Sequence, residues 1–376
     1  MKKSPASAMP AFFAVAFVWF TTHFGGGFAS GRQLVQFFVQ YGWYALFTPI
    51  IAMLLNAVIF YFVWDFSVSQ KKFDYKSWCD GFYSPYEKIF TPLYEIVFNL
   101  TLFTATAVAF ATGGATLTQV IGTPYILNTA VIAIIMFIVT IYGADMIRAV
   151  ASWIAIIVIA GLLLIYGSNF IAILPNLREV IATAPAPQGT WPPLWEALKY
   201  GGLQASVLGS YVAVADVLKD KRDVKKAAVA GFILNAFIIG LAAIVILSYY
   251  PAILTEAVPV IYVINNGVGG RAGELLVSVL IFLGVISTGV NLIYGGAKRV
   301  IRVFAKEKSD ASDKKAEIIA SAVYVLLTWG IALFGLIPLV AKGYGYIGYI
   351  SIPAIVIPVL YMGFMRKNNS AKASNM

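Results

Sequence analysis

The stretch Phe24-Gly25-Gly26-Gly27-Phe28-Ala29-Ser30-Gly31 lies in the middle of the first hydrophobic segment, residues 10–40. Three consecutive glycines disfavour an unbroken helix, because each costs about 1 kcal/mol relative to alanine, or about 3 kcal/mol together. In lipid, a broken helix frees backbone N–H and C=O groups, which need partners from the protein or from a bound solute or ion. The alternative is that the glycines only let neighbouring helices pack closely.

The composition is that of a membrane protein. Of 376 residues, 60% are hydrophobic and only 12% are charged, which excludes an ordinary soluble enzyme. The single cysteine, Cys79, has no partner for an intramolecular disulfide, and the single histidine, His23, excludes a multi-histidine metal centre. The start, Met1-Lys2-Lys3, leads into an apolar run without a clean small-residue cleavage site, so we expect an uncleaved first span.

Hydropathy predicts an all-α membrane protein with ten transmembrane helices of about 20 residues in one domain, 1–376. Longer loops are expected at 168–193 and 249–273, and the tail 366–376 is expected to be disordered. The ten expected spans are 10–40, 43–64, 86–112, 125–143, 146–167, 194–217, 226–248, 274–300, 316–337 and 345–365.

The positions of lysine and arginine predict the orientation. Of the 27 basic residues, 22 fall on one side of the membrane, and the positive-inside rule then makes both termini cytoplasmic. The net charge of +10 is therefore a topology signal, with anionic lipid headgroups rather than nucleic acid as the expected partner. The other five basic residues are Arg32, Arg178, Lys199, Arg271 and Lys342.

The glycine stretch has a counterpart in the sixth span. Gly25-Gly26-Gly27-Phe28-Ala29-Ser30 aligns with Gly201-Gly202-Leu203-Gln204-Ala205-Ser206 at four of six positions, with an offset of 176 residues. Each copy interrupts the first span of a five-span half, and an odd number of spans inverts the second half. The sequence thus predicts an inverted repeat, about 8–168 and about 190–365, with discontinuous first and sixth spans and a binding site between them.

This layout resembles the five-plus-five transporters of the amino acid–polyamine–organocation superfamily, which share the LeuT fold. The stretch 25–33, Gly-Gly-Gly-Phe-Ala-Ser-Gly-Arg-Gln, is similar to the YkvI-type bacterial membrane proteins. The resemblance covers the layout of all ten spans, with motif matches in spans one, six and eight. It implies an ion-coupled secondary transporter in the bacterial cytoplasmic (inner) membrane.

The two breaks predict a solute site. The N–H end of a broken helix attracts a carboxylate and the C=O end attracts a cation, which together suit a small zwitterion such as an amino acid. The alternative for the two phenylalanines is packing against neighbouring helices. The expected solute-binding residues at the breaks are Phe24, Gly25, Gly26, Gly27, Phe28, Gly202, Gln204 and Ser206.

Span eight carries adjacent hydroxyls, Ser287 and Thr288, which suit Na⁺ because hard cations prefer oxygen ligands. The resemblance implies a sodium site that adds Gly284 of span eight with Thr21 and Phe24 of span one. The alternative is that the hydroxyls bond back to carbonyls one turn earlier. Span five lacks the lysine that replaces sodium in some proton-coupled relatives, which favours Na⁺. We expect no other cofactor.

Two ionisable residues lie at membrane depth. Glu95 is a functional candidate by position, as a proton relay, a solute ligand or the counter-charge of a cationic solute. The alternative is a carboxylate that is hydrogen-bonded to Tyr94 or Asn99, or paired with Lys88. His23, next to the break, is a second possible proton site, and its alternative is a hydrogen-bonded packing residue.

Arg32 follows the first break. In the family an arginine near this position pairs with an acid on span ten, but residues 344–365 contain no acid, so Glu196 is the expected partner in an outer gate. An inner gate or solvated helix ends are the alternatives for Asp145, Arg148 and Asp216.

The combined prediction is a Na⁺ symporter for a small amine-containing solute, working by alternating access. A proton-coupled transporter of the same fold and a ligand sensor of the germinant-receptor type are the alternatives. A channel is disfavoured because no ring of charges or filter sequence is visible. An enzyme is not expected, because the sequence has no His-Glu-x-x-His motif and only one histidine.

Overall fold

The computed structural model describes residues 9–142, 144–183, 189–304 and 314–374, and within these ranges all regular structure is helical. Side chains are described there except at 26, 144–152, 302–304 and 368–374. Eight helical stretches of the described residues are long and apolar enough to cross a membrane. They are α4 (Thr48–Gln70), α6 (Glu87–Ile121), α7 (Tyr125–Tyr142), α8 (Ala144–Thr183), α11 (Lys221–Leu247), α13 (Gly270–Phe304), α14 (Lys314–Ala332) and the run Leu336–Lys367.

The first expected span is broken at the glycines. Helix α1 (Ala11–His23) ends there, and the chain continues as α2 (Gly26–Ala29) and α3 (Arg32–Phe37). Between α1 and α2, Gly25 is extended, with φ −60° and ψ 172°. Between α2 and α3, Gly31 has φ 80°, a conformation that a side chain with a Cβ rarely adopts.

The sixth expected span is also broken, but the glycine pair is not the break. Helix α9 (Trp191–Ala205) runs through both glycines, and α10 (Leu208–Val212) begins after Ser206 and Val207. A Cβ on Gly202 would lie 2.6 Å from the Gly348 carbonyl oxygen. Close helix packing, the alternative reading of a glycine pair, is therefore what these two glycines provide, and the predicted position of the second break was wrong.

Three regions expected to be loops are partly helical. Helix α8 continues to Thr183, past the predicted end of its span at 167, and α12 (Pro259–Asn266) lies within the expected loop 249–273. Helix α17 (Ile357–Ser374) extends through the tail that was expected to be disordered. In α8 and α17 the helix outlasts the apolar run, because hydropathy reports burial in lipid and not helix propensity, whereas α12 is an apolar helix too short to be predicted as a span.

Shorter elements connect the long helices. They are η2 (Val39–Leu46), α5 (Tyr75–Phe82), η3 (Ala213–Val217), η4 (Ala252–Thr255), α15 (Leu336–Pro338), η5 (Leu339–Tyr344), α16 (Gly345–Ser351) and η6 (Ile352–Val356). The two elements η5 and η6 are π-helical turns within the last span.

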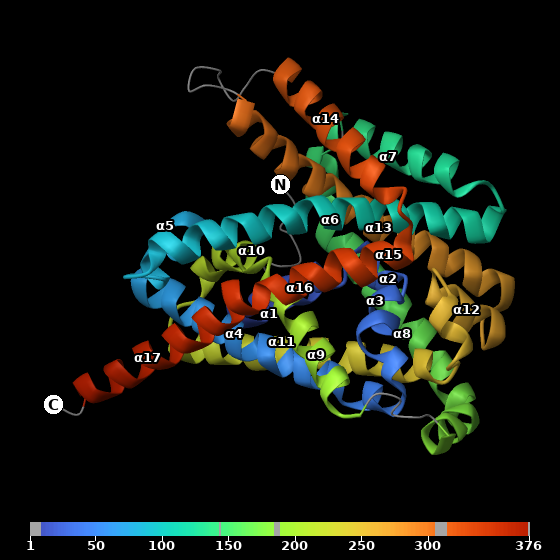
Figure 1. The fold of residues 1–376 in the computed structure, drawn as a ribbon, viewed down its shortest axis with the longest axis horizontal. Coiled ribbons are helices and arrows are strands. Elements are labelled where there is room, and N and C mark those ends of the chain that lie inside the picture. The colour runs from blue at the N-terminus through green and yellow to red at the C-terminus, as the bar shows by residue number, and fades with distance from the viewer. Residues whose placement is uncertain (1–8, 143, 184–188, 305–313, 375–376) are drawn as a thin grey trace.

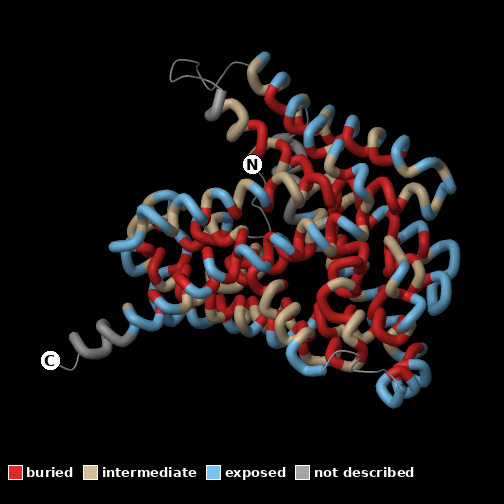
Figure 2. The backbone as a smooth tube through the Cα atoms, in the orientation of Figure 1, coloured by how far each residue is buried: buried red, intermediate tan, exposed pale blue. Residues whose placement is uncertain are grey.

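The long helices lie side by side, with α5 and the end of α17 at one end of the bundle and α12 at the other (Figure 1). Buried residues fill the middle and exposed ones coat the outside (Figure 2). The broken first span is at the centre: Trp19 is fully buried, and a Cβ on Gly231 of α11 would come within 2.2 Å of its ring. Exposed apolar side chains such as Ile134 and Leu326 match a lipid-facing surface.

Candidate functional site

A cavity of about 590 Å³ lies on one side of the two breaks. Its size falls in the range of small-molecule sites, about 300–1,000 Å³. Its walls come from α1, α6, α8, α10 and α13, and they are mainly apolar. The polar and charged side chains that line it are Thr21, Thr22, Ser210, Ser287, Thr288, Asn291 and Arg299.

The cavity extends toward one end of the molecule. Helix α1 lines it up to Thr22, just before its break, whereas α10 lines it after the second break. On α13 the lining runs from Ser287 to Arg299, which is about 18 Å along a helix. Helix α6 contributes Phe98 and Leu102 from its first half. All four helices therefore present the halves that belong to the same membrane side, the side that the basic residues predict to be cytoplasmic.

The five residues of the expected sodium site lie around one small pocket of about 40 Å³. Thr21 and Phe24 come from the end of α1, and Gly284, Ser287 and Thr288 come from α13. Apolar residues of α8 close the remaining side, from Ile154 to Ile159. The last carbonyl groups of α1 have no continuing helix to bond to, so the pocket combines carbonyl and hydroxyl oxygens.

The two α13 hydroxyls do not satisfy themselves within their helix. In the described part of the chain, neither Ser287 nor Thr288 donates a hydrogen bond to a carbonyl one turn earlier. Ser278 on the same helix does so, to the Glu274 carbonyl at 2.7 Å. The Thr21 hydroxyl donates to the Val18 carbonyl at 3.2 Å, which leaves its oxygen lone pairs, like the Thr21 carbonyl, as candidate ligands. The back-bonding alternative thus fails for the α13 pair.

Close approach of the break to α13 requires a glycine. A Cβ on Gly25 would lie 3.3 Å from both the Oγ1 and the Cγ2 of Thr288. The start of α2 is thus held against the hydroxyl pair, and a larger residue would push Thr288 away from the pocket.

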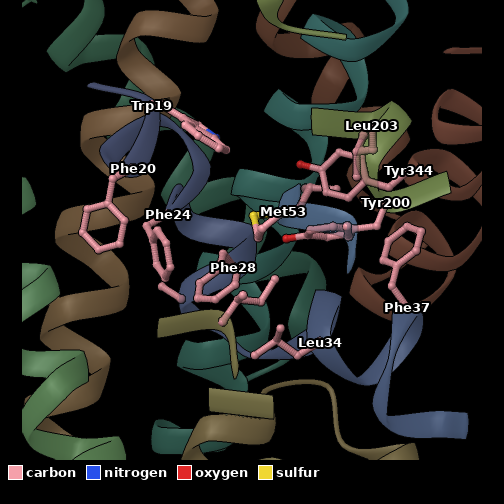
Figure 3. Packing of buried hydrophobic residues seen from close by; sticks show 14 of the residues in the cluster. Trp19, Phe20, Phe24, Phe28, Leu34, Phe37, Met53, Tyr200, Leu203 and Tyr344 are labelled. Carbon is pink, nitrogen blue, oxygen red and sulfur yellow. The ribbon is translucent and has the colours of Figure 1, made fainter. Parts of the chain in front are cut away.

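The solute-binding residues expected from the glycine breaks lie on the closed side. Phe24 and Phe28 are buried with ring centroids 4.1 Å apart, and Tyr200 lies across from Phe28 (Figure 3). Gln204 is buried, and the Ser206 hydroxyl donates to the Leu203 carbonyl at 2.6 Å. Of the expected residues that the structure describes in full, seven do not line the large cavity: Phe24, Gly25, Gly27, Phe28, Gly202, Gln204 and Ser206.

His23 belongs to a buried hydrogen-bond network. Its Nδ1 lies 2.7 Å from Asn235 Oδ1, and its Nε2 lies 2.6 Å from the Tyr200 hydroxyl. The Asn235 amide nitrogen donates to the Gly231 carbonyl, so its oxygen faces His23 and Nδ1 is the donor. The Tyr200 hydroxyl also lies 3.4 Å from Gln33 Oε1. This arrangement matches the packing alternative for His23 and links both sides of the first break to α9 and α11.

Glu95 is paired at the cavity mouth. Its Oε1 lies 2.5 Å from Arg299 Nη1, which also donates to Asn99 Oδ1 at 2.7 Å. Glu95 itself does not line the large cavity, so its expected role as a solute ligand is not matched. Sequence reasoning considered Lys88 and missed Arg299, because this partner lies 204 residues away on another helix and no local pattern marks it.

The expected outer ion pair does not form. The Arg32 guanidinium donates to the main-chain carbonyls of Leu254, at 2.8 Å, and Glu256, at 3.1 Å. Glu196 instead pairs with Lys199 at 2.7 Å, because one helical turn separates them. The Val260 N–H also donates to the Ser30 carbonyl at 3.1 Å, and these contacts join the outer half of span one to η4 and α12.

The structure describes the side chain of only one residue that was considered for an inner gate. Asp216 is exposed on η3, whereas the side chains of Asp145 and Arg148 lie outside the described residues.

With this geometry, the fold is similar to that of a solved membrane transporter. A solved structure of a Na⁺-coupled sialic acid symporter, in a substrate-bound outward-open state, matches with a TM-score of 0.62 at 13% identity, over 95% of this chain and 90% of that chain. A mutant manganese transporter of Eremococcus coleocola gives a TM-score of 0.49 at 11% identity, over 95% and 86% of the two chains.

In sequence, the chain is similar to the uncharacterized membrane protein YkvI of Bacillus subtilis (strain 168). The two are 23% identical over 309 residues, which is 80% of this chain and 83% of that protein. No family model matches the sequence. The comparisons thus support a membrane protein with a transporter-like fold.

Proposed function

We propose that this protein is a Na⁺-coupled secondary active transporter of a small amine-containing solute, such as an amino acid. The observation that carries the proposal is the pocket where the end of α1 meets Ser287 and Thr288, two hydroxyls without partners inside their helix. Carbonyl and hydroxyl oxygens in a space of about 40 Å³ fit a small hard cation. The pocket adjoins a cavity large enough for a solute.

The architecture proposed for this function is a five-plus-five inverted repeat of the amino acid–polyamine–organocation type, in the bacterial cytoplasmic membrane. Its halves are residues 8–168 and 190–365. The support is that a broken span begins each half, α1 to α3 in the first and α9 to η3 in the second. The eight helical stretches long enough to cross the membrane supply the remaining spans.

The conformation supports alternating access. The cavity reaches the proposed cytoplasmic end, while Arg32, Ser30 and Val260 hold the outer side closed. Sodium in the small pocket would bind α1 and α13 at once, and so would favour the state in which α1 stays against α13. Loss of the ion would free the inner half of span one and release the solute to the cytoplasm.

Proton coupling is the second candidate and has less support. Glu95 is paired with Arg299, and His23 has hydrogen-bond partners at both ring nitrogens. No carboxylate contacts His23 among the described residues, so a charged imidazole there would be buried without a counter-ion.

Thermal unfolding of the purified protein with a panel of amino acids and amines, in NaCl or choline chloride, tests the coupling. We expect at least one solute to stabilise the protein only in sodium, because a ligand that binds the folded state raises its stability by RT ln(1 + [L]/Kd), and coupling makes Kd depend on sodium. Uptake of the same solute into sealed vesicles separates a transporter from a sensor, which binds without accumulation.

The ion site has its own variants. Ser287→Ala combined with Thr288→Ala should abolish sodium-dependent stabilisation. Ser278→Ala is the matched control, since its hydroxyl lies on the same helix but bonds to Glu274. Sodium dependence that survives in the double variant would remove the ion-site assignment.

A further inference from the structure

We propose that Arg299 is a binding subsite for the carboxylate group of the transported solute at the cavity mouth, where Glu95 takes the solute's place when the cavity is empty. This inference rests on the proposed transport function and specifies the solute class: the solute bears a carboxylate.

The charge of the cavity supports an anionic group. Among the described residues that line it, Arg299 is the only one with a charged side chain, and none is an acid. The neighbouring Lys298 does not line the cavity and pairs with Glu317 at 2.6 Å. A cationic solute would thus meet one positive charge and no acid, whereas a carboxylate would meet a guanidinium.

One edge of the Arg299 guanidinium, formed by Nε and Nη2, makes no hydrogen bond to a described residue. Its Nη1 donates both of its hydrogens, to Glu95 Oε1 and to Asn99 Oδ1. A guanidinium carries five N–H donors, so three remain on Nε and Nη2, and no described residue accepts them. Two parallel donors on that edge match the two oxygens of a carboxylate. The guanidinium carbon lies 4.6 Å from the centroid of the Phe98 ring, which orients its plane.

The pair with Glu95 is weak enough to be exchanged. The side chain of Glu95 is 34% exposed and that of Arg299 is 23% exposed. Ion pairs at such half-exposed positions contribute little net free energy, since water competes for both charges. Glu95 Oε1 also accepts a hydrogen bond from Asn99 Nδ2 at 3.2 Å, so this carboxylate keeps a partner when a solute carboxylate shares or replaces it on Arg299.

From its position, we infer that Arg299 binds the solute while the solute enters or leaves the cavity. It lies about 18 Å along α13 from Ser287, so a small solute cannot touch both the sodium pocket and Arg299 at once. The subsite would hold a solute on its way between the cytoplasm and the deep end of the cavity, separately from the ion.

The test measures binding of 4,4,4-trifluorobutyrate and its neutral isostere 4,4,4-trifluorobutanamide to the full-length protein by ¹⁹F NMR titration. We expect the wild type to bind the carboxylate about tenfold more tightly than the amide, as charge-assisted hydrogen bonds commonly provide. Arg299→Gln should abolish this preference. Glu95→Gln should strengthen carboxylate binding by a few-fold, because the internal competitor loses its charge.

Lys298→Gln is the matched control. It removes the same charge one residue away but outside the cavity, and should leave the preference unchanged. If Arg299→Gln does not fold, Arg299→Lys decides: it keeps the charge but loses the two-donor edge, so the preference should fall.

The proposal is overturned if the wild type shows no preference for the carboxylate over the amide. It is also overturned if Arg299→Gln and Lys298→Gln reduce this preference equally. Sodium-dependent stabilisation should persist in Arg299→Gln, so failure of this subsite and failure of the sodium site give different results.

Discussion

Gly25 is the residue at which the break in span one meets the pocket that we propose for the ion. Its extended backbone ends α1, and its lack of a Cβ lets α2 start against Thr288. The three glycines predict the break from sequence because they act locally, through backbone conformation. The adjacent hydroxyls Ser287 and Thr288 are likewise visible in the chain, whereas Gly284, Thr21 and Phe24 entered the expected sodium site only through the family resemblance.

Gly25→Ala should weaken sodium binding by about tenfold while the protein still folds. The new Cβ would lie 3.3 Å from Thr288 Oγ1 and displace the hydroxyl by a few tenths of an ångström. A sodium titration followed by thermal unfolding measures the apparent affinity. Gly167→Ala on α8 is the control, because a Cβ there meets nothing within 4 Å. Equal sodium affinities in the two variants would contradict the role of Gly25.

Helices α1, α9 and α11 are joined by contacts that the sequence does not reveal. Tyr200 lies 177 residues from His23, and Asn235 lies 212 residues from it. No local pattern marks either residue as a partner, since hydrogen bonds between distant spans depend on how helices rotate and pack. The role of the glycine pair of α9 was misassigned for the same reason. Gly202 is needed because the Gly348 carbonyl of α16 packs against it, not because the backbone of α9 breaks there.

Tyr200→Phe should lower the free energy of unfolding by about 1–3 kcal/mol, because it leaves the buried His23 Nε2 without a partner. Reversible unfolding of the protein in mixed detergent micelles provides the measurement. Tyr346→Phe, at a position that is 66% exposed, is the control and should have almost no effect. A similar loss in both variants would mean that the hydroxyl contributes nothing specific.

Gly202→Ala separates packing from binding at the second break. A Cβ 2.6 Å from a main-chain oxygen forces α9 and α16 apart, and we expect a loss of about 1–3 kcal/mol of stability. Sodium affinity should stay at its wild-type value, because Gly202 does not line the ion pocket. Gly330→Ala on α14, where a Cβ meets nothing within 4 Å, is the comparison. Loss of sodium binding with intact stability would restore the original expectation of a glycine site.

In the molecule as a whole, contacts of span one close the end at which α12 lies, and the large cavity extends toward the opposite end. Sequence reasoning placed the long apolar helices and both broken spans, because hydropathy and glycine content act over single segments. It did not locate the solute cavity. That cavity lies on only one side of the breaks in this conformation, and its mouth depends on the pairing of α6 with α13.

Labelling of Ser210→Cys with a membrane-impermeant thiol reagent tests which side is open. Ser210 lines the cavity, while the native Cys79 is fully buried and should not react. We expect modification in inside-out vesicles without sodium, and slower modification when sodium holds α1 against α13. Thr118→Cys, which lines an outer pocket near Glu256, should react only in right-side-out vesicles. Modification of Ser210→Cys from the outside would reverse the proposed orientation.

Arg32 holds the half of span one that we propose to be outer against η4, through main-chain oxygens rather than through an acidic side chain. Every amino acid supplies the same main-chain carbonyl, so positions 254 and 256 can change during evolution without loss of these two hydrogen bonds. The arginine has no such freedom. Among homologues, we therefore expect an invariant arginine at position 32, whereas the residues at positions 254 and 256 should vary.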